Sequence, residues 1–199
     1  MNRTHDPILL YAVGDICPSR PDPGSLFAEV TPELQRADIA FCQLEINLTK
    51  RGTRLPQARH TDRTSPETAH AIRGAGFNVV SFAGNHCMDW GQEGFFDTID
   101  ALKAAGLAVV GVGPNIEEAR KPAVIDTKGC RVGFLAYNSI LPLKREGLRK
   151  ARLSVSAKRF QLPWQRWPMA PWLMLSILKM RSIMLPFTQT RRWSPRRFL

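Results

Sequence analysis

Short apolar runs alternate with helical segments along residues 7–137, and this alternation limits the possible fold more than any other feature of the chain. Helical segments are expected where apolar residues recur every three or four positions, most clearly over residues 91–105. Strands that alternate with helices predict an α/β fold built on a layered sheet. The expected strands cover residues 7–16, 37–44, 77–83, 107–112, 123–126 and 132–137, and the expected helical or irregular segments cover 24–36, 66–75, 91–105 and 115–120.

Three of the expected strands end in polar side chains that can bind a metal ion. Asp15 closes the first strand, Glu45 follows the second, and Asn85-His86 follows the third. In an open α/β sheet, ligands collect at the carboxyl ends of the strands, where several loops converge. Carboxylate and amide oxygens suit hard divalent cations, and imidazole extends the choice to Mn, Fe or Zn. The coincidence of three such strand ends favours a divalent-metal site.

Each of these residues also has an ordinary structural interpretation. Asp15 can be a turn or N-cap residue, Glu45 a solvated loop carboxylate, and Asn85 part of a turn that leaves His86 half-buried. Asp89 adds weight to the metal interpretation because it lies three residues beyond His86. If a helical turn begins there, the Asp89 carboxylate shares a face with His86 and can hold its second ring nitrogen.

Longer segments surround these residues in a definite order: GDI, QLE followed by NLT, GNHCMDWGQEG, GLAVVGVGPNIEEARKP and VGFLAY. Over about residues 8–140 they resemble the CapA family, the capsule-synthesis proteins of the poly-γ-glutamate system. The resemblance implies a calcineurin-like metallophosphatase fold, which is a layered α/β sandwich. It also implies a phosphoesterase-like hydrolase that takes part in capsule or poly-γ-glutamate biosynthesis.

The resemblance assigns roles to five residues. It implies that a divalent metal ion (Mn, Fe, Zn or Mg) is bound by Asp15, Glu45, Asn85 and His86. It further implies that His86 and Asp89 are catalytic, with Asp89 supporting the imidazole. In such folds, metal-bound hydroxide attacks a phosphoryl or comparable centre, while the histidine stabilises charge or protonates the leaving group.

The chain departs from the family pattern at several positions. Gln43 and Cys17 stand where the Asn of Asn-Leu-Glu and the His of Asp-x-His are usual, and no histidine follows His86. The His-Trp-Gly and Gly-His-x-His segments of the family's second half are therefore missing. We expect only the front half of the sandwich, over residues 1–147, with poor metal affinity and weak or absent hydrolysis. The alternative is a non-catalytic accessory or membrane-associated module in capsule synthesis, so enzymatic activity stays open.

Two further motifs have both a functional and an ordinary interpretation. Arg59 and His60 could bind an anionic substrate, either a small molecule or a polymer, or could belong to a solvated basic loop. Gly111-Val112-Gly113-Pro114 resembles a phosphate loop but lacks the required lysine and glycine pattern. A tight turn in which Asn115 caps the next helix is the favoured interpretation. The cysteines Cys17, Cys42 and Cys87 are interpreted as small buried residues.

Residues 148–199 differ in composition from the rest and are expected to form an irregular basic tail. The net charge of +11 arises there: residues 150–199 hold 11 Lys and Arg but no Asp, Glu, Gly or His. The favoured explanation is a frameshift or truncation past about residue 143. A basic amphipathic anchor at an anionic membrane, with a helix over residues 172–185, is the second explanation. Nucleic-acid binding is the least favoured.

The N-terminal residues show neither a signal peptide nor a membrane span, because the apolar stretch before Gly14 is short. The four cysteines form no CxxC pair, which favours reduced thiols. Both observations predict a cytoplasmic protein, with peripheral membrane attachment through residues 150–199 as an additional possibility.

Overall fold

The computed structural model describes residues 6–56, 58, 62–138 and 172–177. The strands are β1 (Leu10–Ile16), β2 (Ile39–Leu44), β3 (Asn47–Leu48), β4 (Arg63–Thr64), β5 (Val79–Ser81), β6 (Ala108–Val110), β7 (Ala123–Thr127), β8 (Cys130–Ala136) and β9 (Trp172–Ile177). The helices are α1 (Thr31–Leu34), α2 (Thr68–Gly74), α3 (Gly91–Ala104) and α4 (Ile116–Ala119), preceded by a 3-10 turn, η1 (Pro23–Leu26).

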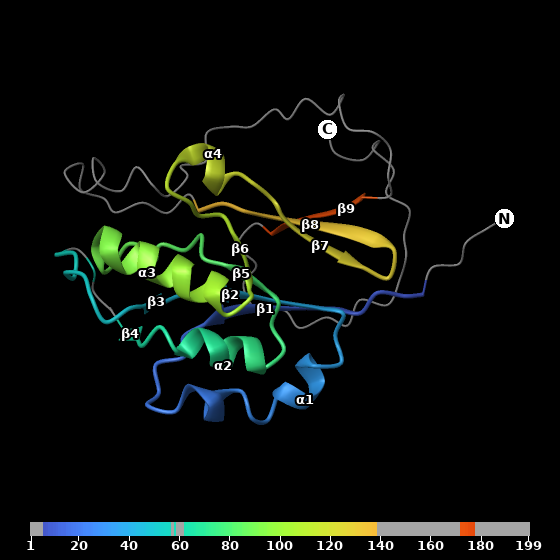
Figure 1. Cartoon of the computed structure of the whole chain (residues 1–199), viewed down its shortest axis with the longest axis horizontal. Coiled ribbons are helices and arrows are strands. Elements are labelled where there is room, and N and C mark those ends of the chain that lie inside the picture. The colour runs from blue at the N-terminus through green and yellow to red at the C-terminus, as the bar shows by residue number, and fades with distance from the viewer. Residues whose placement is uncertain (1–5, 57, 59–61, 139–171, 178–199) are drawn as a thin grey trace.

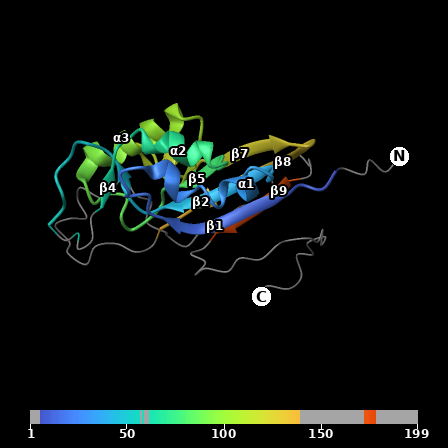
Figure 2. The ribbon, with the colours of Figure 1, turned by 90° about the horizontal axis from the view of Figure 1, so that it is seen from below.

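A four-stranded parallel sheet in the order β1-β2-β5-β6 forms the centre of the described fold. A second sheet, in the order β7-β8-β9, lies on the side of this sheet opposite α2 and α3 (Figure 1). Figure 2 shows β1 along the outer edge of the parallel sheet, with β2 beside it. The α/β fold and the parallel sheet expected from the sequence are therefore confirmed.

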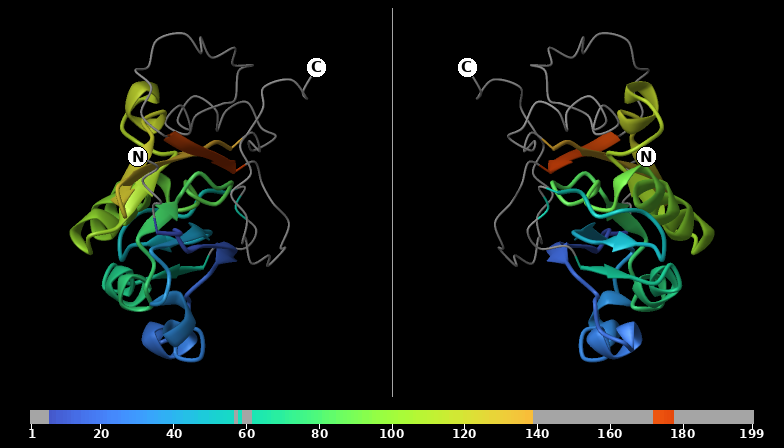
Figure 3. Two further views of the ribbon diagram at one scale, coloured as in Figure 1. Left: turned by 90° about the vertical axis from the view of Figure 1, so that its right-hand side faces the viewer. Right: turned by 90° about the vertical axis from the view of Figure 1, so that its left-hand side faces the viewer.

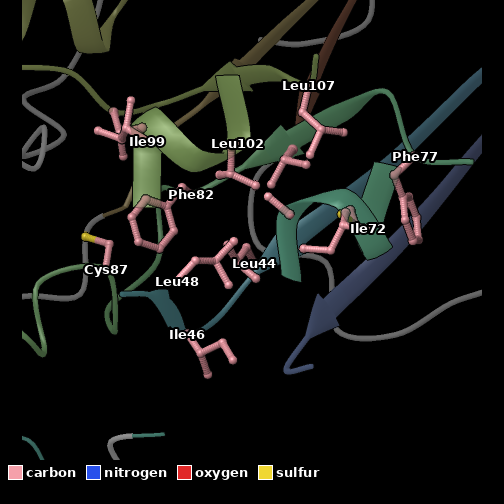
Figure 4. Packing of buried hydrophobic residues seen from close by; sticks show 14 of the residues in the cluster. Leu44, Ile46, Leu48, Ile72, Phe77, Phe82, Cys87, Ile99, Leu102 and Leu107 are labelled. Atoms are coloured by element: carbon pink, nitrogen blue, oxygen red, sulfur yellow. The ribbon is translucent and has the colours of Figure 1, made fainter. Parts of the chain in front are cut away.

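Strand β2 is buried on both faces, and its alternating residues enter two separate cores. Ala40, Cys42 and Leu44 pack into the larger cluster, under α2 and α3 (Figure 4). Ile39 and Phe41 enter the smaller cluster, which lies between the two sheets. There the ring of Phe41 stacks on Phe134 of β8, with ring centroids 5.8 Å apart and planes 3° from parallel. Helices, parallel sheet and second sheet therefore form three layers, as Figure 3 shows from two sides.

Local sequence signals explain where several elements end. Gly76 and Gly106 follow α2 and α3 with φ of +113° and +78°, so each helix stops at a residue that tolerates the left-handed region. Asn115 caps α4, because its Oδ1 accepts the Glu118 amide at 2.9 Å. The expected turn after Pro114 is confirmed. Lys128 and Gly129 both have positive φ, as a tight hairpin between β7 and β8 requires.

Two features differ from the expectations. The pair β3–β4 was not expected, because two-residue strands carry no readable periodicity and lie in a polar segment. Residues 172–177 form β9, parallel to β8, so the irregular tail expected there is wrong for these six residues, as is the helix of the alternative explanation. An added strand pairs the edge groups of β8, which a helix could not do.

The other predictions for residues 150–199 lie outside the described residues, as does the explanation of that tail by a frameshift. The metallophosphatase-type sandwich, the truncation and the boundary at residue 147 stay predictions. Within the part of the chain that the structure describes, no helix is both long and apolar enough to cross a membrane.

Candidate functional site

The carboxyl ends of β1, β2 and β5 lie next to one another. Asp15 pairs in register with Gln43, and Gln43 pairs with Ser81 on its other side. The Glu45 amide continues this pairing, since it donates to the Ile16 carbonyl at 3.0 Å. Parallel strands place their carboxyl ends at one sheet edge. The polar residues that follow the three strands are therefore brought to the same edge, as the sequence predicted.

A compact turn carries Asn85 and His86 from β5 to α3. The turn begins where the Gly84 amide donates to the Phe82 carbonyl at 2.8 Å and ends where the Gly91 amide donates to Met88 at 2.9 Å. Gly84 passes close to β2, because a Cβ at this position would lie 3.0 Å from Gln43 Nε2. The Gln43 amide nitrogen itself donates to the Leu44 carbonyl at 3.1 Å. Gln43 therefore stabilises the strand ends through its nitrogen.

His86 and Asp89 form the closest polar pair of this turn. His86 Nδ1 lies 2.6 Å from Asp89 Oδ2, which is the contact expected from their spacing. The His86 side chain is 33% exposed and that of Asp89 is 13% exposed, so the carboxylate is the more deeply placed partner. Burial raises the pKa of Asp89, while the hydrogen bond from His86 and the charge of Arg54 oppose that rise. The pair orients the imidazole and leaves Nε2 for a substrate or a ligand.

The candidate donor set is chemically suited to a divalent ion, since it combines two carboxylates, an amide and an imidazole. The four candidate side chains differ in how far they are buried. Asp15 is exposed, whereas Glu45, Asn85 and His86 are half-buried. Among the residues that the structure describes, no three His, Cys, Asp or Glu side chains form a group that could hold a metal ion. The described residues thus supply suitable donors at one edge, and a complete coordination shell needs further ligands or a rearrangement.

The loop between β3 and β4 contacts the turn and brings in Arg54, which the sequence did not predict, while Arg63 begins β4. The Leu55 amide donates to the Asp89 carbonyl at 2.8 Å, which places Arg54 beside the His86–Asp89 pair. The Arg63 guanidinium stacks 3.8 Å from the centre of the Trp90 ring. Only the basic character of the loop could have indicated these contacts. Arg59 and His60, predicted to bind substrate, lie outside the described residues.

The cysteines near the site are free thiols. Cys42 and Cys87 are buried as expected, and burial raises the pKa of Cys87 to about 12 and that of Cys42 further. Cys17 is exposed, so its assignment as a buried residue is wrong. It follows the end of β1, where the chain leaves the sheet. Partial desolvation of its thiol, followed by the charges of Asp62 and Glu45, raises the pKa of Cys17 as well.

The loop is anchored to α3 through Asp97. Arg51 Nη2 donates to Asp97 Oδ1 at 2.5 Å, and the Thr49 hydroxyl donates to Asp97 Oδ2 at 2.6 Å. The hydrogen bonds from Arg51 are the main reason why the pKa of Asp97 is lowered. The unfolded chain therefore takes up a proton at this group before the folded chain does. The contribution of Asp97 to stability is full above its ordinary pKa of about 3.9 and is lost as the pH falls through the lowered value.

We expect Asp97→Asn to lower the urea midpoint most between pH 5 and 7, and the difference from the native sequence to shrink below about pH 4. Urea unfolding followed by circular dichroism across this pH range checks the effect. Asp100→Asn is the control, because Asp100 is exposed on the same helix. A difference for Asp97→Asn that stays constant down to pH 3 would contradict the anchoring role.

Comparison with known proteins gives a consistent family assignment. The family described as "Bacterial capsule synthesis protein PGA_cap" matches residues 9–171. The uncharacterized protein y4sH of Sinorhizobium fredii (strain NBRC 101917 / NGR234) is 31% identical over 173 residues, which cover 78% of this chain and 37% of y4sH. The capsule biosynthesis protein CapA of Bacillus anthracis is 39% identical over 71 residues, covering 36% of this chain and 17% of CapA.

The PGA biosynthesis protein CapA of Bacillus subtilis (strain 168) is 28% identical over 99 residues, covering 49% of this chain and 26% of its own length. The chain thus spans well under half the length of these relatives. The family match includes all three strand ends of the candidate site and continues past residue 147, where the sequence analysis placed the domain boundary. Because that match covers most of the chain, the protein belongs to the bacterial capsule synthesis family PGA_cap, as its resemblance to CapA predicted.

Proposed function

We propose that this chain contributes a divalent-metal-dependent hydrolase site to capsule or poly-γ-glutamate biosynthesis. The observation that carries the proposal is the His86–Asp89 pair at the carboxyl edge of the parallel sheet, within the family match. Two relatives are named for CapA and its role in capsule or PGA biosynthesis, which supports the biological context. The hydrolytic chemistry is our extension of these findings.

His86 is the proposed proton-transfer residue. Asp89 accepts a hydrogen bond from Nδ1 and so selects the orientation in which Nε2 faces a bound substrate. The carboxylate also stabilises the imidazolium that forms when Nε2 takes up a proton. From that nitrogen, His86 can donate the proton to a leaving oxygen. Half-burial of both side chains limits access of bulk water and strengthens the electrostatic interaction between them.

Asp15, Glu45 and Asn85 would bind the metal ion, which is Mn, Fe, Zn or Mg on the chemistry of this donor set. His86 would bind it through Nε2, so metal binding and proton transfer are alternative roles of that nitrogen, because Nδ1 is held by Asp89. When bound, such an ion supplies Lewis acidity at the edge of the sheet. Because the described side chains do not converge, we expect weak binding, in which water or other parts of the protein complete the shell. Turnover by this chain alone is expected to be correspondingly slow.

The proposed substrate is anionic, either a small molecule or a polymer. Arg54 supports this choice because its charge lies close enough to Asp89 to oppose the rise in pKa that burial causes in that carboxyl group. Arg54 Nε and Nη2 are held by the Ala58 carbonyl, at 3.2 and 2.6 Å, so the guanidinium is fixed near the pair. A positioned guanidinium recognises carboxylate or phosphate groups well. Arg59 and His60 remain proposed further contacts.

We expect the purified chain to bind Mn²⁺ weakly and His86→Ala to weaken that binding at least about tenfold, because an imidazole ligand is lost. Isothermal titration with MnCl₂, together with hydrolysis of p-nitrophenyl phosphate, checks both parts of the proposal. His70→Ala is the matched control, since His70 is exposed on α2 and away from the strand ends. Equal Mn²⁺ binding by His86→Ala and the native chain would show that the site is not the one proposed.

A non-catalytic accessory role is the second candidate. It is favoured by the absence of a converged three-residue metal-binding group among the described side chains. The probable polyglutamine synthesis accessory protein Rv0574c of Mycobacterium tuberculosis (strain ATCC 25618 / H37Rv) is 31% identical over 88 residues, which is consistent with such a role. A folded chain that binds no Mn²⁺ and hydrolyses no phosphoester would favour this candidate.

A further inference from the structure

We propose that Asn47 is a positioning residue, whose side-chain amide holds the turn that presents His86 and Asp89. This inference rests on the proposed function, since it concerns the same site. Asn47 lies in β3, two residues after Glu45, and neither the chemistry of the candidate ligands nor the strand-end pattern selects it. The evidence is the burial of Asn47, its hydrogen bond to the turn and the hydrogen bonds that hold β3 on α3.

Asn47 reaches the centre of the turn. Its side chain is fully buried, with no exposed surface, and Nδ2 donates to the Cys87 carbonyl at 2.9 Å. Cys87 immediately follows His86 and lies two residues before Asp89. A shift of the Cys87 peptide therefore changes the relative position of the two side chains that form the 2.6 Å contact. The hydrogen bond spans 40 positions in the sequence and joins the segment after β2 to the segment after β5.

The oxygen of the Asn47 amide, Oδ1, bears on the role of this residue. Asn47 Oδ1 is buried and has no hydrogen-bond partner among the described groups. Leaving a buried acceptor unsatisfied costs free energy, and an apolar side chain of similar shape would avoid that cost. The donation from Nδ2 to Cys87 is thus the contact that accounts for an amide at this position.

Strand β3 cannot move away from the turn, because α3 holds it on the other side. The Leu48 amide donates to Thr98 Oγ1 at 2.9 Å, and the Thr98 hydroxyl donates to the Gly94 carbonyl at 2.7 Å. Gly94 lets the helix approach the segment after β3, since a Cβ there would lie 3.2 Å from Thr49 Cγ2 and 2.6 Å from the Trp90 Cβ. The contacts of β3 with α3 therefore fix the position of Asn47. Through its hydrogen bond to Cys87, Asn47 in turn fixes the position of the neighbouring His86.

The test compares Asn47→Asp with Asn78→Asp in the full chain. Asn47→Asp keeps the shape but replaces the donor by an acceptor facing the Cys87 carbonyl. Asn78→Asp makes the same change at a part-buried amide whose Nδ2 donates to the Asp38 carbonyl at 3.2 Å, just before β5 and away from the turn. We expect both variants to lower the melting temperature. In ¹⁵N-labelled, metal-free protein, only Asn47→Asp should shift the His86 Nδ1 proton and ring-nitrogen resonances.

The His86 resonances of Asn47→Ala are measured as well. This variant replaces Asn47→Asp in the test if Asn47→Asp does not fold, because it removes the donor without adding a charge. Unchanged His86 resonances in a folded Asn47 variant, or an equal shift in Asn78→Asp, would overturn the positioning role. These spectra need no metal, so they are independent of the proposed function. If the native chain binds no Mn²⁺, the hydrolase proposal fails while the spectra still decide the role of Asn47. If the native chain binds Mn²⁺, we expect the Asn47 variants to lose at least about fivefold in affinity for Mn²⁺, because residues that orient metal ligands affect metal affinity.

Discussion

Phe134→Ala is expected to lower the free energy of unfolding by about 3–5 kcal/mol, the range for removing a buried aromatic ring from a core. Phe134 is 1% exposed and stacks on Phe41, so its ring joins the β7-β8-β9 sheet to the parallel sheet. The small cluster between the sheets contains eight buried residues, and few of its members could move to fill the space. The loss of buried apolar area and the cavity that remains therefore both destabilise the interface between the two sheets.

Equilibrium urea unfolding, followed by fluorescence and circular dichroism, measures this loss. Val124→Ala is the matched control, because Val124 lies on the adjacent β7 but is 39% exposed. Its expected effect is within about 0.5 kcal/mol, as is usual at exposed positions. If Phe134→Ala were as mild as Val124→Ala, the second sheet would not pack on the parallel sheet through this ring.

Gly111→Ala is expected to lower the free energy of unfolding by about 2–5 kcal/mol, from a left-handed residue that costs about 1–2 kcal/mol and overpacking that costs about 1–3 kcal/mol. Gly111 has φ of +85°, and an added Cβ would lie 2.6 Å from the Ala83 Cβ and 2.8 Å from the Ala136 carbonyl oxygen. Ala83 lies two residues before Asn85. The substitution should therefore disturb the turn that carries His86 as well as the fold.

Thermal unfolding and the His86 resonances together measure both effects. Gly74→Ala is the matched control, since Gly74 ends α2, has no positive φ and has no atom within 4 Å of an added Cβ. Alanine there should leave stability unchanged or raise it slightly, because it reduces the freedom of the unfolded chain. A Gly111→Ala protein as stable as Gly74→Ala would mean that β6 does not approach Ala83 and Ala136 as described.

The contrast between the two motifs at the ends of β5 and β6 shows how far the sequence could predict the site. The spacing of His86 and Asp89 was sufficient, because a single local turn brings them together whatever the rest of the chain does. The interpretation of GVGPN as a turn with a helix cap was also sufficient, since Asn115 acts on an amide three residues away. The packing reason for Gly111 was not readable, because its neighbours are Ala83, which follows β5, and Ala136 of β8.

The difference between local signals and contacts between distant segments also separates the correct predictions from those that failed or were missing. Apolar alternation, glycine stops and helix spacing predicted most strands and helices of residues 10–136, though not β3 and β4, because these signals act within a few residues. Contacts such as Asn47 with Cys87, Leu55 with Asp89 and Arg63 with Trp90 join segments far apart in the chain. They carry no periodic signal and form only when the sheet order β1-β2-β5-β6 brings the segments together. Local chemistry therefore identified the candidate residues, and long-range packing alone decided how they are held and that their side chains do not converge as a metal site.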